Sequence, residues 1–349
     1  MYSNRWYSNF GPLVRRFESD ILSFLQEHNG AQDCFVGTFS SATTALELVL
    51  KAIHLPKGSR VLVPALTFPA TALAVLNVGM IPVLADVAPE SWELTPEIAE
   101  NALSEKAISV VMPVAAFGKP VDSAGWAAFQ QKTGVPVVLD AAAALGQQDI
   151  LGELIYCFSL HATKPFGVGE GGLLVTGNED LVIETKSLSN FGFQGPAGVV
   201  REIGTNAKFG EYYAAVGLAQ IGRWQEVMDR RTAVLDQYKA GLHRAGNSVS
   251  LQQGTGNFIP AVFPVYAKGR AKALEEKLAD AGIHTRRWYL PPLYEHPGLK
   301  GMEGVVNLEP ASFPVCEDLK ESLLGLPFHG FLTAEDTAEI SNIVAEETA

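Results

Sequence analysis

The sequence is poor in cysteine, in positive charge and in long apolar runs. Its 349 residues include three cysteines, Cys34, Cys157 and Cys316, which lie far apart and show no CxxC spacing. This set predicts reduced thiols, as in the cytoplasm, instead of a disulfide framework. Lys and Arg number 26 against 38 Asp and Glu, a formal net charge of −12. The balance argues against a nucleic acid or an anionic membrane as the main partner.

Signals for membrane insertion, export and metal binding are missing too. Proline, glycine or charge breaks each apolar window before it reaches about 18 residues, so we expect no transmembrane helix. The first residues contain no charged segment followed by an apolar core, which predicts no signal peptide. The seven histidines show no HxxxH or HExxH spacing, and the cysteines complete no site. We therefore expect a cytoplasmic protein without a bound metal.

The sequence does contain a series of short apolar runs, which predict an α/β fold. Runs of Val, Ile and Leu that do not alternate with polar residues suit strands covered on both faces, as in a mostly parallel sheet. Thr95 and Pro96 open an intervening helix with an N-cap hydroxyl and a proline at the first helical position. The expected strands are 60–64, 81–86, 109–114, 136–140, 157–160 and 172–176, and the expected helices are 69–78, 95–104 and 123–132. Ligands of such sheets bind at the carboxyl ends of the strands.

The pattern changes after residue 209. Residues 209–242 are helical in character, 258–266 form a strand candidate and 269–281 a helix candidate. A chain of 349 residues is also too long for one small domain. We expect a large domain, residues 1–240, with a mostly parallel sheet covered by helices, and a smaller α+β domain, residues 241–349.

Two residues indicate a type of reaction. Lys164 precedes a glycine-rich stretch, and Asp140 ends an apolar run. A lysine amine forms a Schiff base with the aldehyde of pyridoxal phosphate (PLP), and a carboxylate keeps the pyridine nitrogen protonated so that the ring withdraws electrons. Alone, a lysine is usually a solvated charge and a strand-end aspartate often only caps the next element. The pair together predicts a PLP site.

Two further features suit that cofactor. A helix expected to begin near Ser41, because its apolar residues repeat at i, i+3, i+4 and i+7, offers free N–H groups and a dipole that favour a phosphate. Taken alone, a plain capped helix is the simpler interpretation, and Lys164 makes the phosphate site the better one. Phe68, after a strand, is a candidate to stack on a flat ring, although an isolated Phe usually packs in a core.

Two weaker signals are set aside. Residues 167–172 match GxGxxG, but they follow a Lys-Pro loop and lead into a strand, whereas a dinucleotide fingerprint follows a strand and opens a helix. Cys316 could be imagined as a nucleophile of a desulfurase. It has no glycine-rich mobile segment around it, so we expect a structural cysteine.

In order and spacing, segments along nearly the whole chain resemble the nucleotide-sugar aminotransferase family of the DegT/DnrJ type. Its members are fold-type I PLP enzymes, so the resemblance implies that fold here. The most diagnostic segments are Asp140 to Ala142, and Ser159 to Lys164 followed by Gly169 to Gly172. The others are residues 9–12, 41–46, 67–71, 117–122, 204–206 and 326–329.

The resemblance implies a role for each candidate residue. Lys164 would hold the cofactor as a Schiff base and carry the proton, Asp140 would pair with the pyridinium, and Phe68 would stack on the ring. Lysine at position 164 also separates this chain from the dehydratase branch of the family, which carries histidine there.

The resemblance also implies the phosphate contacts and the oligomeric state. Ala42, Thr43 and Ser159 would hold the phosphate. Asn206 would reach the phosphate of a neighbouring subunit, which implies a homodimer with shared active sites. Three places depart from the family pattern. Ala143 replaces the Gln or His that touches the ring hydroxyl, and Lys208 replaces an arginine, so that the bidentate fork is lost. Residues 209–211 also differ from the usual hydrophobic-Ser/Asp-Glu.

We expect the enzyme to transfer an amino group from an amino acid such as glutamate to a nucleotide-linked keto-deoxysugar. Four residues are weaker candidates for the sugar side: Arg286, Arg287, Tyr289 and His296. Two alternatives stay open. One is a PLP-binding regulator that has lost turnover, and the other is an aminotransferase acting on a cyclitol or a free keto-sugar.

Overall fold

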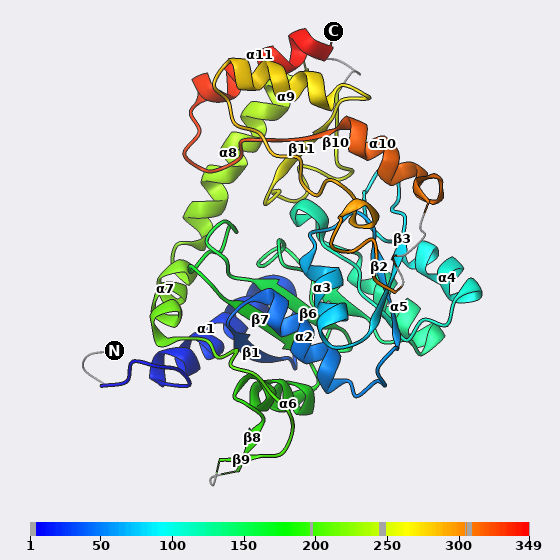
Figure 1. Ribbon diagram of the computed structural model, residues 1–349. Helices are drawn as coiled ribbons and strands as arrows, with labels where there is room; N and C mark the ends of the chain where they lie inside the picture. Colours follow the sequence, from blue (N-terminus) through cyan, green and yellow to red (C-terminus); the bar gives the residue numbers. More distant parts are fainter. Residues whose placement is uncertain (1–4, 196–197, 244–248, 304, 306–308, 349) are drawn as a thin grey trace.

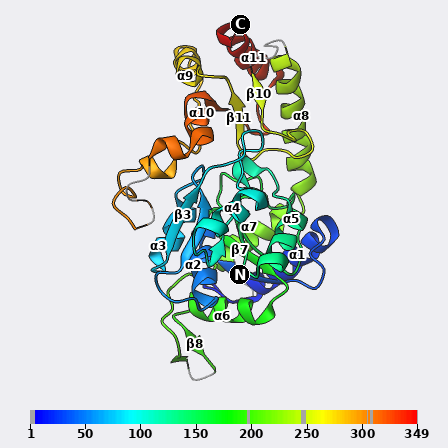
Figure 2. The ribbon, with the colours of Figure 1, turned by 90° about the vertical axis from the view of Figure 1, so that its right-hand side faces the viewer.

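A computed structural model describes residues 5–195, 198–243, 249–303, 305 and 309–348 of the chain (Figure 1). A sheet with helices on both faces forms the larger part, and a long helix leads from it to a smaller part that carries the C-terminal helix (Figure 1, Figure 2). The strands of the larger sheet are β1 (Phe35–Phe39), β2 (Arg60–Pro64), β3 (Ile81–Ala85), β4 (Val110–Val111), β5 (Val138–Asp140), β6 (Ile155–Ser159) and β7 (Gly172–Thr176).

These strands lie in the order β3-β2-β4-β5-β6-β7-β1. Strand β2 is parallel to β3 and β4, and β5 is parallel to β6. Parallel bridges from Val111 to Val137 and from Val114 to Asp140 connect β4 with β5. Strand β7 is antiparallel to both β6 and β1. The carboxyl ends of β1, β2, β5 and β6 therefore meet at one edge of a mostly parallel sheet, where β7 begins.

Both faces of the sheet are covered, which explains its unbroken apolar strands. Along β2, Val61 and Val63 pack into one core and Leu62 into the other, as alternation along a strand requires. The first core lies under α2 (Ala42–Ala52), α3 (Ala70–Asn77) and α6 (Glu179–Ser189). The second lies under α1 (Pro12–Asn29), α4 (Pro96–Glu105), α5 (Ser123–Thr133) and α7 (Glu211–Ile221).

Local capping residues start two of these helices where the sequence predicts. The Ser41 hydroxyl accepts the amide of Thr44 at 3.1 Å, and the Thr44 hydroxyl accepts the amide of Ser41, which forms a capping box at the start of α2. The Thr95 hydroxyl accepts the amide of Ile98 at 3.3 Å at the start of α4.

Helix α1 is capped from far along the chain. Its N-cap residue is a glycine, which has no side chain to offer. The carboxylate of Glu211, at the start of α7, accepts the amides of Leu13 at 3.0 Å and Val14 at 2.9 Å instead. This buried carboxylate ties the first helix to α7 and places negative charge at the positive end of the α1 dipole.

The smaller part forms a third core. Its strands β10 (Ser250–Leu251), β11 (Phe263–Tyr266) and β12 (Leu323–Leu326) are antiparallel. They pack with α9 (Ala271–Asp280), α11 (Ala334–Thr348) and the end of α8 (Trp224–Leu242). Helix α10 (Pro314–Ser322) instead places Cys316 in the first core of the larger part. The boundary expected after residue 240 lies inside α8 and stays a prediction. No described helix is long and apolar enough to cross a membrane.

Candidate active site

The predicted site residues gather at the edge where the parallel strands end. Ser41 to Thr43 follow β1, Phe68 follows β2, and Asp140 and Ser159 are the last residues of β5 and β6. Lys164 lies in the loop between β6 and β7. The connections after four strands, β1, β2, β5 and β6, thus bring the candidates together, as expected for a ligand site of a parallel sheet.

Hydrogen bonds between the two arms of the β6–β7 loop hold Lys164 in place. The amides of Leu160 and Ala162 donate to the carbonyls of Gly171 and Gly169 at 2.9 and 2.8 Å, and the amide of Lys164 donates to His161 at 2.9 Å. The lysine is half-buried, and burial lowers its pKa while the nearby Asp140 opposes that shift. A lowered pKa makes the neutral, nucleophilic amine available at lower pH.

Asp140 is a buried carboxylate, 5% exposed, with partners on both oxygens. The Thr71 hydroxyl donates to Oδ2 at 2.7 Å, and the amide of Ala142 donates to Oδ1 at 3.2 Å. Burial raises the pKa of Asp140, while the hydrogen bonds from Thr71 and Ala142 and the positive charge of Lys164 lower it. The carboxylate therefore suits a cationic partner such as a protonated ring nitrogen.

The start of α2 can bind an anion. Among the described residues, the amides of Ala42 and Thr43 have no acceptor, whereas the next two amides of the helix are bonded to Ser41. Ser159 is buried at the end of β6, and its hydroxyl oxygen accepts the amide of His161 at 3.2 Å, which leaves its proton to donate. Free amides at a helix N-terminus beside a hydroxyl suit a phosphate.

A glycine brings β7 close to this turn. A Cβ on Gly172 would lie 2.2 Å from the carbonyl oxygen of Ser41, so no larger residue fits without moving the start of α2. Strand β7, which follows the loop that carries Lys164, is thereby packed directly against Ser41 and Ala42, where the phosphate is expected to bind.

Phe68 is an exposed ring beside two other aromatic rings, and its stacking on a ligand stays a prediction. It is 49% exposed, and its ring centroid lies 5.9 Å from that of Trp288 and 6.4 Å from that of Tyr289. Tyr289 stacks on Phe117 at 4.8 Å. Burial and the Asp140 carboxylate raise the pKa of the Tyr289 phenol, which shows that this ring, predicted for the sugar side, lies close to Asp140.

The other sugar-side candidates are placed differently. Arg287 faces Glu275 of α9 at 3.7 Å and donates to the carbonyl of Lys320. Arg286 is exposed and donates to the carbonyl of Thr285 at 3.3 Å. His296 follows the short turn 293–295 and is half-buried. Their roles stay predictions.

Asn206 is exposed and lies in the segment that leads into α7. It forms a bridge with Asn190, and its side-chain oxygen accepts a hydrogen bond from Lys208 at 2.5 Å. The Lys208 ammonium also lies 4.3 Å from the ring centre of Phe191, and burial lowers its pKa. Among the described residues, Asn206 forms no hydrogen bond with the predicted cofactor residues, and its role towards another subunit stays a prediction.

The residues present fit PLP. The free amides of Ala42 and Thr43 suit the phosphate, the Asp140 carboxylate suits the pyridinium, and the Lys164 amine suits the aldehyde. Ala143 is buried and presents no polar side chain to the ring hydroxyl. Sequence reasoning missed Thr71, whose hydroxyl donates to Asp140. The local signal is a second hydroxyl residue four positions after Thr67, in the segment that follows β2.

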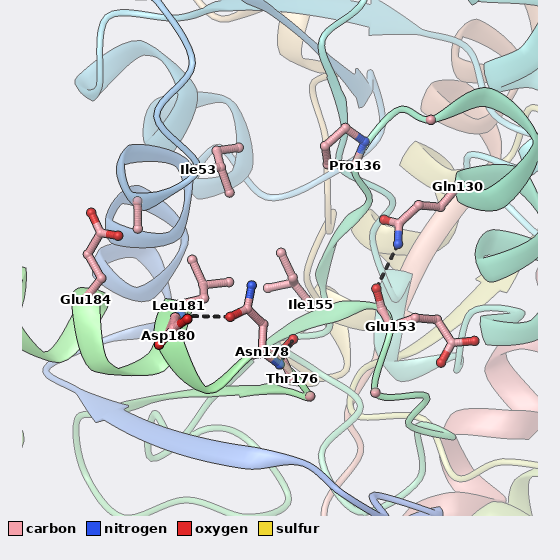
Figure 3. Close-up of a pocket in the computed structure, with 14 residues that line it drawn as sticks. Ile53, Gln130, Pro136, Glu153, Ile155, Thr176, Asn178, Asp180, Leu181 and Glu184 are labelled. Atoms are coloured by element: carbon pink, nitrogen blue, oxygen red, sulfur yellow. Dashed lines mark hydrogen bonds between the residues drawn. The ribbon is translucent and has the colours of Figure 1, made fainter.

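A separate cavity of about 740 Å³ lies at the opposite end of the strands (Figure 3). Ile155, which begins β6, and Thr176, which ends β7, are in its wall. Figure 3 shows two other wall residues already bonded: Gln130 donates to the carbonyl of Glu153, and Asn178 accepts the amide of Leu181. None of the described candidate residues lines this cavity, so it is not the site of the predicted chemistry.

Known proteins resemble this chain over nearly its full length. UDP-2-acetamido-2-deoxy-3-oxo-D-glucuronate aminotransferase of Pseudomonas aeruginosa is 27% identical, with 97% of this chain and 90% of the relative covered. The erythromycin biosynthesis sensory transduction protein EryC1 of Saccharopolyspora erythraea is 30% identical, with 95% and 88% covered. The crystal structure of DesV of S. venezuelae, in complex with a ketimine intermediate, has a TM-score of 0.88 at 26% identity and covers 99% of this chain and 91% of that chain.

The family model of the DegT/DnrJ/EryC1/StrS aminotransferases matches residues 1–345. This match and the likeness to DesV confirm the predicted α/β aminotransferase fold, the aminotransferase class and PLP as the cofactor. The chain therefore belongs to the DegT/DnrJ/EryC1/StrS aminotransferase family.

Proposed function

We propose that the protein transfers an amino group from an amino acid, with glutamate as the first candidate, to a nucleotide-linked keto-deoxysugar. The observation that carries the proposal is the pairing of Lys164, whose pKa burial lowers, with the buried carboxylate of Asp140 at the edge where the parallel strands end. The Pseudomonas aeruginosa relative is named for a UDP-linked 3-oxo sugar, which supports this class of acceptor.

Each residue of the site has a task in this proposal. When bound, PLP supplies an aldehyde that exchanges amines and a ring that withdraws electrons from the substrate carbon. Lys164 would hold the cofactor through Nζ until the amine of the donor displaces it. The freed Nζ would then take a proton from the α-carbon of the donor and, in the second half of the reaction, give one to the former keto carbon of the acceptor. One rigidly placed amine can act as both base and acid. Asp140 would hold the proton on the ring nitrogen, and Phe68 would cover one face of the ring.

The phosphate anchor sets the position of the whole cofactor. The amides of Ala42 and Thr43 and the Ser159 hydroxyl would bind the phosphate, with Asn206 of a second subunit completing the set. Exposed apolar residues around the β8–β9 hairpin (Phe193–Gln194, Val199–Val200) support a homodimer with shared sites. The hairpin projects from the larger part (Figure 1), and nearby Ile203 is 82% exposed.

We also propose a cytoplasmic location, which the three free, buried cysteines support. A complementation experiment tests the shared sites. Lys164→Ala and Asn206→Ala each damage a different half of a shared site, so mixing the two inactive variants should restore activity in mixed dimers. An N206A variant that is inactive and is not rescued by K164A would contradict the sharing.

The proposed reaction is tested in its two halves. Purified protein mixed with glutamate should lose the absorbance of its PLP form and release 2-oxoglutarate. A panel of nucleotide-linked keto-sugars, followed by mass spectrometry, should then yield an aminated product. Borohydride reduction and peptide mapping should find PLP on Lys164, and K164A should lose both the adduct and turnover.

The same experiment separates the alternatives. A protein that binds PLP but releases the corresponding 2-oxo acid from no amino acid is a regulator. The name of the EryC1 relative, a sensory transduction protein, is the reason to test for this. A protein that completes the first half but aminates only cyclitols or free keto-sugars has the other acceptor class. An adduct at a lysine other than 164 would overturn the assignment of the catalytic residue.

A further inference from the structure

Two buried threonines lie behind the carboxylate of Asp140. Thr71 is fully buried in the first turn of α3, and Thr67, four residues earlier, is 1% exposed. Their hydroxyl oxygens are 2.9 Å apart, and the Thr71 hydroxyl is 2.7 Å from Oδ2 of Asp140. We name these two residues the threonine pair.

The direction of these hydrogen bonds follows from the chemistry of the groups. An ionised carboxylate only accepts, so the single proton of Thr71 goes to Asp140. The oxygen of Thr71 is then free to accept, and Thr67 is its donor. Hydrogen bonds in such a chain strengthen one another in a dry interior, so Thr67 makes Thr71 a better donor.

Because Asp140 is buried, the hydrogen bonds from the threonine pair matter for its charge. Removing the carboxylate of Asp140 from water disfavours its charge, and few groups compensate. The hydrogen bond from Thr71 is the shorter of the two that Asp140 accepts, at 2.7 Å against 3.2 Å for the amide of Ala142. A short hydrogen bond to a charged acceptor is among the stronger kinds.

We propose that Thr71, supported by Thr67, is a positioning residue that fixes the orientation of Asp140 and keeps it ionised opposite the pyridine nitrogen of PLP. The proposal rests on the proposed function only in that PLP is the cofactor and Asp140 its partner. It assigns a function to two residues that do not touch the substrate.

In the described part of the chain, three other titratable groups lie near Asp140, and each comes from a different element. Lys164 of the β6–β7 loop favours its ionised form. Cys157 of β6 pairs with it in register, and Tyr289 lies near it; burial and, to a smaller extent, the Asp140 charge raise the pKa of both. Neither of these two groups is charged at neutral pH, so Thr71, Ala142 and Lys164 carry the stabilisation.

The test compares Thr71→Val, Thr71→Ser and Thr67→Val with the wild-type protein. T71V keeps the shape and removes the hydroxyl, and T71S keeps the hydroxyl. Each protein is reconstituted with PLP labelled with ¹⁵N at the ring nitrogen, and the chemical shift of that nitrogen is followed against pH. The dissociation constant of PLP is measured beside it, and circular dichroism confirms the fold.

In T71V the ring nitrogen should lose its proton at lower pH than in the wild type, and PLP should dissociate at least about tenfold more readily, as expected for the loss of one hydrogen bond to a charged group. T71S should restore both readouts, and T67V should show a smaller change in the same direction. A T71V protein with wild-type ring protonation, or a T71S protein no better than T71V, overturns the proposal.

Should T71V fail to fold, T67V decides: a protein indistinguishable from wild type overturns the proposal. These readouts need bound PLP but no sugar. If no nucleotide-linked sugar is aminated, the proposed acceptor fails while the role of the threonine pair is still decided.

Discussion

The close packing of Gly172 against Ser41 and Ala42, at the start of α2, gives a sharp prediction for Gly172→Ala. A Cβ at this position would lie 2.2 Å from the carbonyl oxygen of Ser41, 2.3 Å from its carbonyl carbon and 2.6 Å from the amide nitrogen of Ala42. Real Cβ atoms essentially never come closer than 3.0 Å to a non-bonded heavy atom of another residue. All three clashing atoms belong to the backbone, so no side-chain rotation relieves them. Either β7 or the start of α2 must move.

The expected cost is that of overpacking, about 1–3 kcal/mol in the free energy of unfolding. Displacing the amides of Ala42 and Thr43 should also weaken PLP binding at least about tenfold, equivalent to about 1.4 kcal/mol. Pyridoxal, which lacks the phosphate, makes the assay specific. Because its binding does not use these amides, G172A should lower its affinity less than that of PLP.

Gly210→Ala is the matched control. The nearest atoms to a Cβ there are 3.7 Å away, and the backbone φ of −94° suits alanine. G210A should keep the stability and PLP affinity of the wild type. If G172A does the same, or weakens pyridoxal and PLP equally, then the phosphate does not bind at the start of α2.

Other predictions concern stability. Burial raises the pKa of Glu93 from 4.5 to about 7, despite Lys119 beside it. A carboxyl group with a raised pKa contributes stability at low pH that is lost as pH rises. Between about pH 4.5 and 7 the free energy of unfolding of the wild type, measured in urea, should therefore fall by up to about 3 kcal/mol relative to that of Glu93→Gln. A difference between the two proteins that stays constant with pH would contradict this. Glu211→Ala should cost about 2 kcal/mol by uncapping α1, with Glu211→Gln milder, and equal losses in both variants would refute the capping role.

Much of the fold could be predicted because its signals are local. Helices α2 and α4 begin at Ser41 and Thr95, whose own hydroxyls cap them. The central strands are unbroken apolar runs because both faces of the sheet are covered. Helix α1 was missed although local signals exist, namely Pro12 in its first turn and a stripe of buried apolar residues along one face. Only its cap is remote, because Glu211 lies 197 residues or more from the amides it accepts. No local pattern can report such a contact.

The candidate site also contains residues with local sequence signals and residues that only their three-dimensional contacts reveal. Lys164 and Asp140 were identified as candidates because each has a recognisable chemical role beside the end of a strand, and Ser159 was identified only through the family resemblance. The structure gathers them at one edge of the sheet, and their roles stay predictions. Thr71 could not be identified in this way, because a threonine in the first turn of a helix is ordinary until its partner is known, and Asp140 is 69 residues further along the chain. Gly172 was recognised as part of a glycine-rich stretch, but only the packing shows that its missing side chain makes room for Ser41.

The raised pKa of Asp140 leads to a last prediction about the cofactor itself. Burial outweighs Thr71, Ala142 and Lys164, so the folded protein without PLP binds a proton on Asp140 more tightly than the unfolded chain does. This contribution to stability is complete when the pH is below 3.8, the ordinary pKa of an aspartate, and it is lost as pH rises through the raised pKa of Asp140. A bound pyridinium would favour the ionised form and remove the loss. The rise in melting temperature on adding PLP should therefore grow with pH more steeply in the wild type than in Asp140→Asn, where the titrating group is gone. Because the variant retains Lys164 and the phosphate turn, their own pH dependence cancels in the comparison, and parallel curves would show that Asp140 does not pair with the ring.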